Sequence, residues 1–250
     1  MWCNVIRIFY LNNKRISLDL ETMVVIGEGK EGIVYKYNDN ECIKIFNVNR
    51  NNNQLLKINE DKFKLFTTLE TKRIIMPDDL LYNSDNGISG YLMKYINDKF
   101  DINFIRNKSI NEMIKELNDL KNDIEILNTN DILINDLKPP HLLYNKGFYL
   151  IDSSLYSKYQ YDKVLNYNAR ERNKFLINSF LTNILINQRE SINDYDLNFK
   201  EIPYIFLEYT KNQANYIADI LETEANKYKI NNLNELRLIY KKGLNSLKNK

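Results

Sequence analysis

The sequence contains few glycine, proline, cysteine and histidine residues. It has 7 glycines, 4 prolines, 2 cysteines and 1 histidine among 250 residues. The cysteines, Cys3 and Cys42, are too few for a disulfide framework, and they fit a reducing compartment. We therefore expect a cytoplasmic protein.

Long apolar runs and a strong net charge are also missing. No window approaches the ~18 consecutive apolar residues of a membrane span. The apolar stretch near the N-terminus is interrupted by Asn4 and Arg7, which argues against a signal peptide. The net charge is only +2, so composition predicts neither nucleic-acid nor membrane binding.

The first part of the chain, residues 1–97, has mainly strand character. β-rich runs flank the turn "NNK", and "MVVIGEGKEGIVYKY" reads as a strand, a glycine loop and a second strand. The pattern switches to helical spacing over 53–69, where Phe63 and Phe66 fall near one face. We expect a β-rich first part with one helix.

The second part, residues 98–250, has mainly helical spacing. A short hairpin is predicted within "NDLKPPHLLYNKGFYLIDSS". Helices are predicted at 110–128 and around 171–187, 212–228 and 233–247. The pattern predicts an α+β fold class, with a β-rich first part and a mainly helical second part.

Three of the seven glycines fall in "GEGKEGIV", residues 27–34. A tight turn is the simple explanation. A strand–loop–strand with this spacing also lets backbone N–H groups face phosphate oxygens without obstruction by side chains. A dinucleotide-binding fold needs a helix directly afterwards, and a P-loop needs G-K-[ST], and the sequence has neither.

Two further features follow the glycine loop. Lys44 lies between Ile43 and Ile45 on a predicted strand, so it faces the side opposite to both. It is either a solvated lysine on an edge strand or a binding residue. Asp136, in "NDLKPPH", and Asp152, in "YLIDSS", are either turn caps or a pair of functional carboxylates.

In this order the motifs resemble those of the eukaryotic-like protein kinase family, as found in divergent bacterial Ser/Thr kinases. "GEGKEGIV" matches the glycine loop up to Val34, and "DLKP" matches the catalytic loop from Asp136 to Pro139. The resemblance covers about residues 20–187. It implies a two-lobed kinase-like fold. The N-lobe, residues 1–97, would hold an antiparallel sheet and one helix, the C-lobe, residues 98–250, would be mainly helical, and the two would form one domain.

The resemblance implies a nucleotide site in the N-lobe. Lys44 would contact the α- and β-phosphates, held by a carboxylate from the helix at 53–69, for which we choose Glu60, with Asp61 as the alternative. Gly27, Gly29 and Gly32 would cover the phosphates, and Val34 and Cys42 would contact the two faces of the adenine. Met93 would be the gatekeeper residue at the back of the nucleotide site. The backbone of Lys94 and Ile96 would contact the adenine.

The resemblance also implies catalytic roles in the C-lobe. Asp136 would be the catalytic base, Lys138 would contact the γ-phosphate, and Asp152 would bind Mg²⁺ or Mn²⁺. His141 stands where the family has a metal-binding Asn, so it is either a second metal ligand or only a loop residue.

Other positions depart from the family. Ile134 and Asn135 replace the His-Arg before the catalytic Asp, which argues against control by activation-loop phosphorylation and makes Ile134 an apolar packing position. Ser153 replaces the Phe of D-F-G. The segment before the helix near Glu171 is short, and that helix lacks the family's Asp.

The sequence therefore predicts an ATP-dependent phosphotransferase, with a Ser or Thr hydroxyl of an unknown protein as the acceptor. Two alternatives stay open. One is a pseudokinase that binds nucleotide or a partner without catalysis. The other is a small-molecule kinase of the aminoglycoside or choline type, which the short segment after Asp152 favours and "DLKP" disfavours.

Overall fold

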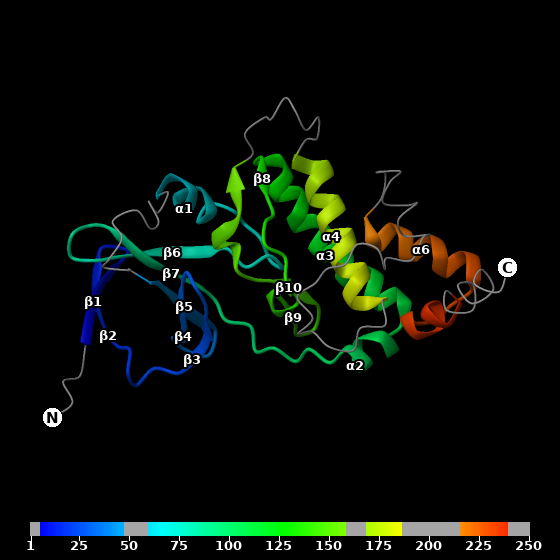
Figure 1. Cartoon of the computed structure of the whole chain (residues 1–250), viewed down its shortest axis with the longest axis horizontal. Coiled ribbons are helices and arrows are strands. Elements are labelled where there is room, and N and C mark those ends of the chain that lie inside the picture. The colour runs from blue at the N-terminus through cyan, green and yellow to red at the C-terminus, as the bar shows by residue number, and fades with distance from the viewer. Residues whose placement is uncertain (1–5, 48–59, 159–168, 187–215, 240–250) are drawn as a thin grey trace. The chain divides into compact units, whose positions relative to one another are not determined.

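A computed structural model gives the fold of the chain (Figure 1). It divides into two compact units, which we call the N-terminal unit (Met1–Glu70 and Ile75–Asn97) and the C-terminal unit (Thr71–Ile74 and Asp98–Lys250). The structure describes residues 6–47, 60–158, 169–186 and 216–239. Cys3, the first part of the predicted helix at 53–69, and parts of the two helices predicted last lie outside these residues.

The N-terminal unit is built on a seven-stranded antiparallel sheet. Its strand order is β2-β1-β6-β7-β5-β4-β3. The first hairpin turns through Asn12 and Asn13, both with positive φ, as a two-residue turn that matches the twist of its strands requires. The strands are β1 (Ile6–Leu11), β2 (Lys14–Asp19), β3 (Val25–Glu28), β4 (Gly32–Lys36), β5 (Glu41–Phe46), β6 (Pro77–Tyr82) and β7 (Ile88–Lys94).

The two faces of this sheet have different roles. One face carries an apolar core that includes Tyr35, Ile43 and Ile45. The neighbouring residues on β5 point to the other face, because side chains alternate along a strand. There Phe46 packs against Phe63 of the helix α1 (Glu60–Phe66), with ring centroids 5.5 Å apart. Burial of Phe63 holds α1 on this face and leaves the rest of the face for a site.

The C-terminal unit is mainly helical. The long helix α3 packs against both α4 and α6, and Figure 1 shows α3 and α4 side by side. Its helices are α2 (Ile102–Asn107), α3 (Ile110–Thr129), α4 (Ala169–Leu185), α6 (Ile217–Tyr228) and a further helical stretch at 233–239.

Short strands and turns at one side of α3 carry the predicted catalytic motifs. A hairpin of β9 and β10 follows the short turn η1, and η2 precedes a second two-stranded pair, β11 with β8. These elements are β8 (Ile132–Leu133), η1 (Pro139–His141), β9 (Leu142–Tyr144), β10 (Phe148–Leu150), η2 (Ser153–Leu155) and β11 (Ser157–Lys158).

The hairpin is tied to α3 through a buried carboxylate. Asp123 is 3% exposed and accepts the backbone N–H groups of Lys72 at 2.7 Å and of Ile74 at 2.8 Å, as well as that of Arg73. Ile74 in turn forms a parallel bridge to Leu150 of β10. The strand that precedes Asp152 therefore has a fixed position relative to α3.

The predicted α+β fold class is confirmed. The helix predicted at 110–128 is α3, and the helix predicted near Glu171 is α4, which begins slightly earlier, at Ala169. The sequence patterns did not predict α2, whose N-cap Asp101 accepts two backbone N–H groups. In the part of the chain that the structure describes, no helix is long and apolar enough to cross a bilayer.

Candidate active site

The predicted adenine and phosphate residues of the N-terminal unit lie on one face of the sheet. Val34 pairs with Lys44 across β4 and β5, and Cys42 pairs with Met93 across β5 and β7. Directly opposite residues of antiparallel strands point to the same face. The four side chains are thus on the face that α1 partly covers.

Lys44 is a buried lysine on a central strand. Its strand, β5, lies between β7 and β4, and the residue is only 6% exposed. The alternative of a solvated lysine on an edge strand is therefore wrong. A buried ammonium group needs an anionic partner, because desolvation penalises the isolated charge.

The carboxylate beside Lys44 comes from the glycine loop rather than from α1. Glu31 Oε2 lies 3.2 Å from Lys44 Nζ. Glu60, predicted as the partner, instead pairs with Lys64 at 2.7 Å, and Asp61 is exposed. The prediction is not met in this structure because Phe63 and Phe66 fix the buried side of α1 and turn Glu60 outward.

The glycine loop itself is held in a closed hairpin. The Gly29 N–H donates to the Gly32 carbonyl at 3.0 Å, and the Asn47 side chain donates to the Gly29 carbonyl at 3.2 Å. Asn47 also donates its backbone N–H to the Glu31 carbonyl at 2.8 Å. These bonds fix where the loop places the Glu31 side chain.

Gly32 and Gly29 differ in the space around them, which gives a matched test. A Cβ at Gly32 would lie 2.2 Å from the Ile45 carbonyl oxygen, whereas nothing lies within 4 Å of one at Gly29. We expect Gly32→Ala to lower the free energy of unfolding by about 2 kcal/mol, because β4 must move from β5. Gly29→Ala is expected to change it by less than about 1 kcal/mol. Urea denaturation measures both, and equal effects would contradict the close approach at Gly32.

Cys42 and Met93 form the buried part of the predicted adenine contact. Cys42 is 3% exposed and its thiol donates to the Lys94 carbonyl at 3.6 Å. Burial, with the nearby carboxylates of Asp78 and Glu41, raises the pKa of Cys42 to about 12. The thiol is therefore protonated at neutral pH and acts as an apolar packing group.

The segment after Met93, at the end of β7 and just beyond it, contains the predicted hinge. The Tyr95 N–H donates to the Asn40 carbonyl at 2.7 Å, which pins the segment to the turn before β5. Lys94 is exposed and Ile96 is 8% exposed. Their predicted backbone contacts to adenine stay predictions.

The catalytic motif of the C-terminal unit lies on the turn that leads into η1. Asp136 has a left-handed backbone conformation with φ 55°, and Asp152 has φ 64°. Asp tolerates this conformation better than most residues, and such positions cluster at functional sites. The two Asp136 oxygens lie 2.6 and 2.7 Å from Lys138 Nζ, so Lys138 balances the charge of the carboxylate.

His141 brings the two aspartates together. Its Nδ1 lies 2.7 Å from the Asp136 carbonyl oxygen. A carbonyl oxygen only accepts, so Nδ1 carries the proton and Nε2 of the neutral ring has a lone pair. Nε2 lies 3.5 Å from Asp152 Oδ2, and one ligand atom from each of the three residues lies within 4.8 Å of the others.

The donor set fits a divalent cation. Two carboxylates and an imidazole are ligands for Mn²⁺ and other first-row metals, whereas Mg²⁺ prefers oxygen alone. A metal-binding imidazole usually donates its second N–H to a carbonyl or carboxylate, which is what Nδ1 of His141 does here. Asp136, His141 and Asp152 are therefore the residues that could hold a metal.

Asn173 of α4 holds the segment before Asp136, a role that the sequence patterns did not predict. The side chain is fully buried. Its Oδ1 accepts the Ile134 N–H at 2.8 Å, and its Nδ2 donates to the Ile132 carbonyl at 2.7 Å and to Asn128 Oδ1 at 2.9 Å. The family's Asp is indeed absent from this helix. The sequence did offer one signal for this role, because an Asn inside a helix is unfavourable unless its side chain has a specific hydrogen-bonding partner.

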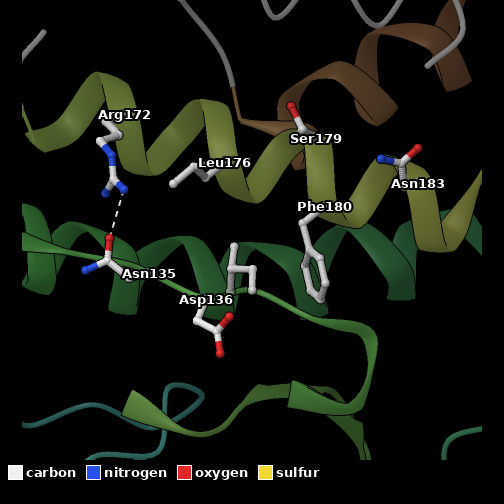
Figure 2. Close-up of a pocket in the computed structure, with 8 residues that line it drawn as sticks. Asn135, Asp136, Arg172, Leu176, Ser179, Phe180 and Asn183 are labelled. Atoms are coloured by element: carbon white, nitrogen blue, oxygen red, sulfur yellow. Dashed lines mark hydrogen bonds between the residues drawn. The ribbon is translucent and has the colours of Figure 1, made fainter. Parts of the chain in front are cut away.

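A second link from α4 reaches Asn135. Arg172 donates to Asn135 Oδ1 at 2.8 Å (Figure 2) and also to the Ile134 carbonyl at 3.1 Å. Asn135 Nδ2 donates onward to the Leu155 carbonyl at 3.0 Å. Ile134 is fully buried, as its predicted packing role requires. The segment is fixed from both sides.

A cavity of about 140 Å³ lies between this segment and α4. Figure 2 shows Leu176 and Phe180 extending from α4 toward the segment, while the Asp136 carboxylate points away from α4. The carboxylate is thus directed out of the cavity. The cavity is lined by Asn135, Asp136, Leu137, Arg172, Leu176, Ser179, Phe180 and Asn183.

The elements and motifs together define a protein-kinase-like fold. The strand–glycine loop–strand, the lysine on the next strand and the two aspartates after α3 occur in the order that the resemblance implies. No family model matches the chain, and no curated protein matches it. Among solved structures, the chain is similar to the kinase PK-1 of the Cydia pomonella granulovirus. The identity is 19%, the match covers 68% of this chain and 70% of that chain, and the TM-score is 0.46.

Proposed function

We propose that the chain is an ATP-dependent phosphotransferase that transfers the γ-phosphate to a Ser or Thr hydroxyl of a protein. The observation that carries this proposal is the group formed by Asp136, His141 and Asp152, with Lys138 beside it. A carboxylate, a metal-binding pair and a cation at one place are the parts that phosphoryl transfer needs.

The N-terminal unit would bind the nucleotide. Val34, Cys42 and Met93 offer an apolar face for the adenine, next to Lys44 for the phosphates. The glycine loop adjoins Lys44 through Glu31. Catalysis would then depend on positioning and on charge, since phosphoryl transfer needs little covalent help from the protein.

The C-terminal unit would carry the chemistry. Asp136 accepts the proton of the acceptor hydroxyl as its oxygen attacks the γ-phosphorus, while the bond to the bridging oxygen breaks and ADP leaves. Lys138 moves from Asp136 to the γ-phosphate and compensates its charge. Asp152 and His141 would hold a divalent cation that neutralises phosphate charge.

A small-molecule kinase is the second candidate. The short stretch between Asp152 and α4 favours it, because a peptide needs a docking platform after the catalytic segment. The two candidates differ in the acceptor and share the catalytic residues.

The first experiment measures transfer of labelled phosphate from ATP to the chain itself and to generic protein acceptors, with Mg²⁺ and with Mn²⁺. Phosphoserine or phosphothreonine in the product supports the proposal. Transfer only to small hydroxyl compounds supports the second candidate. Nucleotide binding without any transfer would identify a pseudokinase and contradict both.

The metal preference gives a separate prediction. We expect the unaltered chain to bind Mn²⁺ about tenfold or more tightly than Mg²⁺, and His141→Asn to lose most of that preference, because an amide oxygen replaces the imidazole. Isothermal titration with each metal ion measures it without catalysis. An unchanged Mn²⁺ affinity in His141→Asn would show that His141 is only a loop residue.

A further inference from the structure

The Lys44–Glu31 ion pair places a carboxylate at the point where a phosphate would meet Lys44. Lys44 Nζ lies 3.2 Å from Glu31 Oε2, and the side chains are 7% and 22% exposed. The loop hydrogen bonds of Gly29 and Asn47 bring Glu31 to this position. The most buried cation of the predicted site is thus already neutralised by the loop expected to cover the nucleotide.

The helix α1 adds a cation to the same region. Lys62 lies over the rings of Phe63 and Phe66, at 4.8 and 5.8 Å from their centroids, and so is held against the buried side of the helix. Burial lowers the pKa of Lys62, the negative charge of Glu31 opposes this, and the positive charge of Lys44 adds to it. The Phe63 ring under Lys62 packs against Phe46, which is two residues after Lys44 on β5 and so on the same face of the sheet. Lys62 therefore lies on the side of α1 that packs on the Lys44 face.

We propose that Glu31, Lys44 and Lys62 form one polyphosphate-binding set, in which the Glu31 carboxylate holds the anion position until a nucleotide phosphate displaces it. This proposal rests on the proposed function for the identity of the ligand. The set places a lysine of α1 where the resemblance implies a carboxylate of that helix.

The charges of the set explain why displacement is feasible. Two lysines and one glutamate leave a net positive charge, which attracts an anion with several charges more strongly than one with a single charge. When a phosphate contacts Lys44, the Glu31 carboxylate can remain near Lys62. Lys44 then has the phosphate and Glu31 has Lys62 as an opposite charge nearby, so neither is left as an isolated buried charge.

The test measures binding of tripolyphosphate, ATP and AMP to the full chain by isothermal titration without metal ions. We expect Glu31→Gln to tighten tripolyphosphate and ATP binding about tenfold, since a competing charge is removed from an anion site. Lys62→Gln is expected to weaken both about tenfold. AMP, with a single phosphate, is expected to change much less in both variants.

Matched controls separate this effect from a general change of charge. Glu28→Gln removes an exposed carboxylate from the same loop, and Lys64→Gln removes an exposed lysine from the same helix. Both are expected to leave the affinities within about twofold, because exposed charges are screened. Glu31→Asp keeps the charge and is expected to resemble the unaltered chain. Thermal unfolding confirms that each variant is folded.

The outcomes distinguish this inference from the proposed function. Weaker or unchanged tripolyphosphate binding in Glu31→Gln would show that Glu31 only orients Lys44, and would overturn the inference. Affinities in Lys62→Gln equal to those in Lys64→Gln would overturn it as well. If tripolyphosphate binding changes as expected but ATP binds no more tightly than tripolyphosphate, the inference stands and the proposed function is contradicted. No binding of either ligand would overturn both.

Discussion

Replacing Asp136 with asparagine is expected to lower the rate of phosphate transfer by about 10² to 10⁴, the usual contribution of a general base. The carboxylate is only 26% exposed and points away from α4 (Figure 2). It lies next to His141 and Asp152. Asparagine keeps the shape of the side chain but cannot accept the proton of the acceptor hydroxyl. Single-turnover transfer from labelled ATP measures the effect.

Asparagine is the informative replacement because of the backbone. Asp136 has φ 55°, a conformation that Asn tolerates and that costs other residues about 1–2 kcal/mol. Asp131, also at φ 55° and exposed, provides the matched control Asp131→Asn. Full activity in Asp136→Asn would refute its role as base. A loss of activity in both variants would mean that the backbone, rather than the carboxylate, is responsible.

Much of the fold was predictable because its sequence signals are local. The alternation around Lys44 gave the correct face, and the spacing along 110–128 gave α3. The doublet of Asn12 and Asn13 forms the turn of the first hairpin. Each of these features depends on residues that are close in sequence, where the period of a strand or helix decides.

The partner of Lys44 was not predictable in the same way. The choice of Glu60 assumed that the kinase pairing applies and that Glu60, three residues before Phe63, lies on the same face of the helix as Phe63. Phe63 instead packs with Phe46 and determines the rotation of the helix, while Glu31 reaches Lys44 from the loop. Tertiary packing sets the rotation of a short helix and the path of a glycine loop, so neither can be predicted from the spacing of residues in the sequence.

The catalytic segment illustrates a second limit. The sequence showed that Ile134 and Asn135 replace the family's His and Arg, and that the helix after the segment lacks the family's Asp. It did not show that Arg172 and Asn173 of α4 bind this segment, since these residues are far apart in sequence. Buried polar groups need hydrogen-bond partners. In this chain Arg172 and Asn173 of α4 supply partners for the backbone before Asp136.

The largest stability effect is expected at Asn173. Asn173→Leu leaves the Ile134 N–H, the Ile132 carbonyl and Asn128 Oδ1 without their partner in a fully buried position. Each buried unsatisfied group costs about 1–3 kcal/mol, so the free energy of unfolding is expected to fall by about 4 kcal/mol. The midpoint of thermal unfolding is expected to fall by roughly 8–16 °C for a chain of this size.

A variant at Asn178, on the same helix, is the control that distinguishes an effect on the catalytic segment from an effect on overall stability. Its Oδ1 accepts the Ile217 N–H at 2.9 Å and so connects α4 to α6, away from the catalytic segment. We expect Asn178→Leu to be destabilised as well but to keep its transfer rate at a temperature where it is folded. Asn173→Leu is expected to lose transfer at that temperature and to keep most of its affinity for ATP, because the residues proposed to contact the adenine and the α- and β-phosphates belong to the N-terminal unit. Equal transfer rates in the two variants would reduce Asn173 to a purely structural residue.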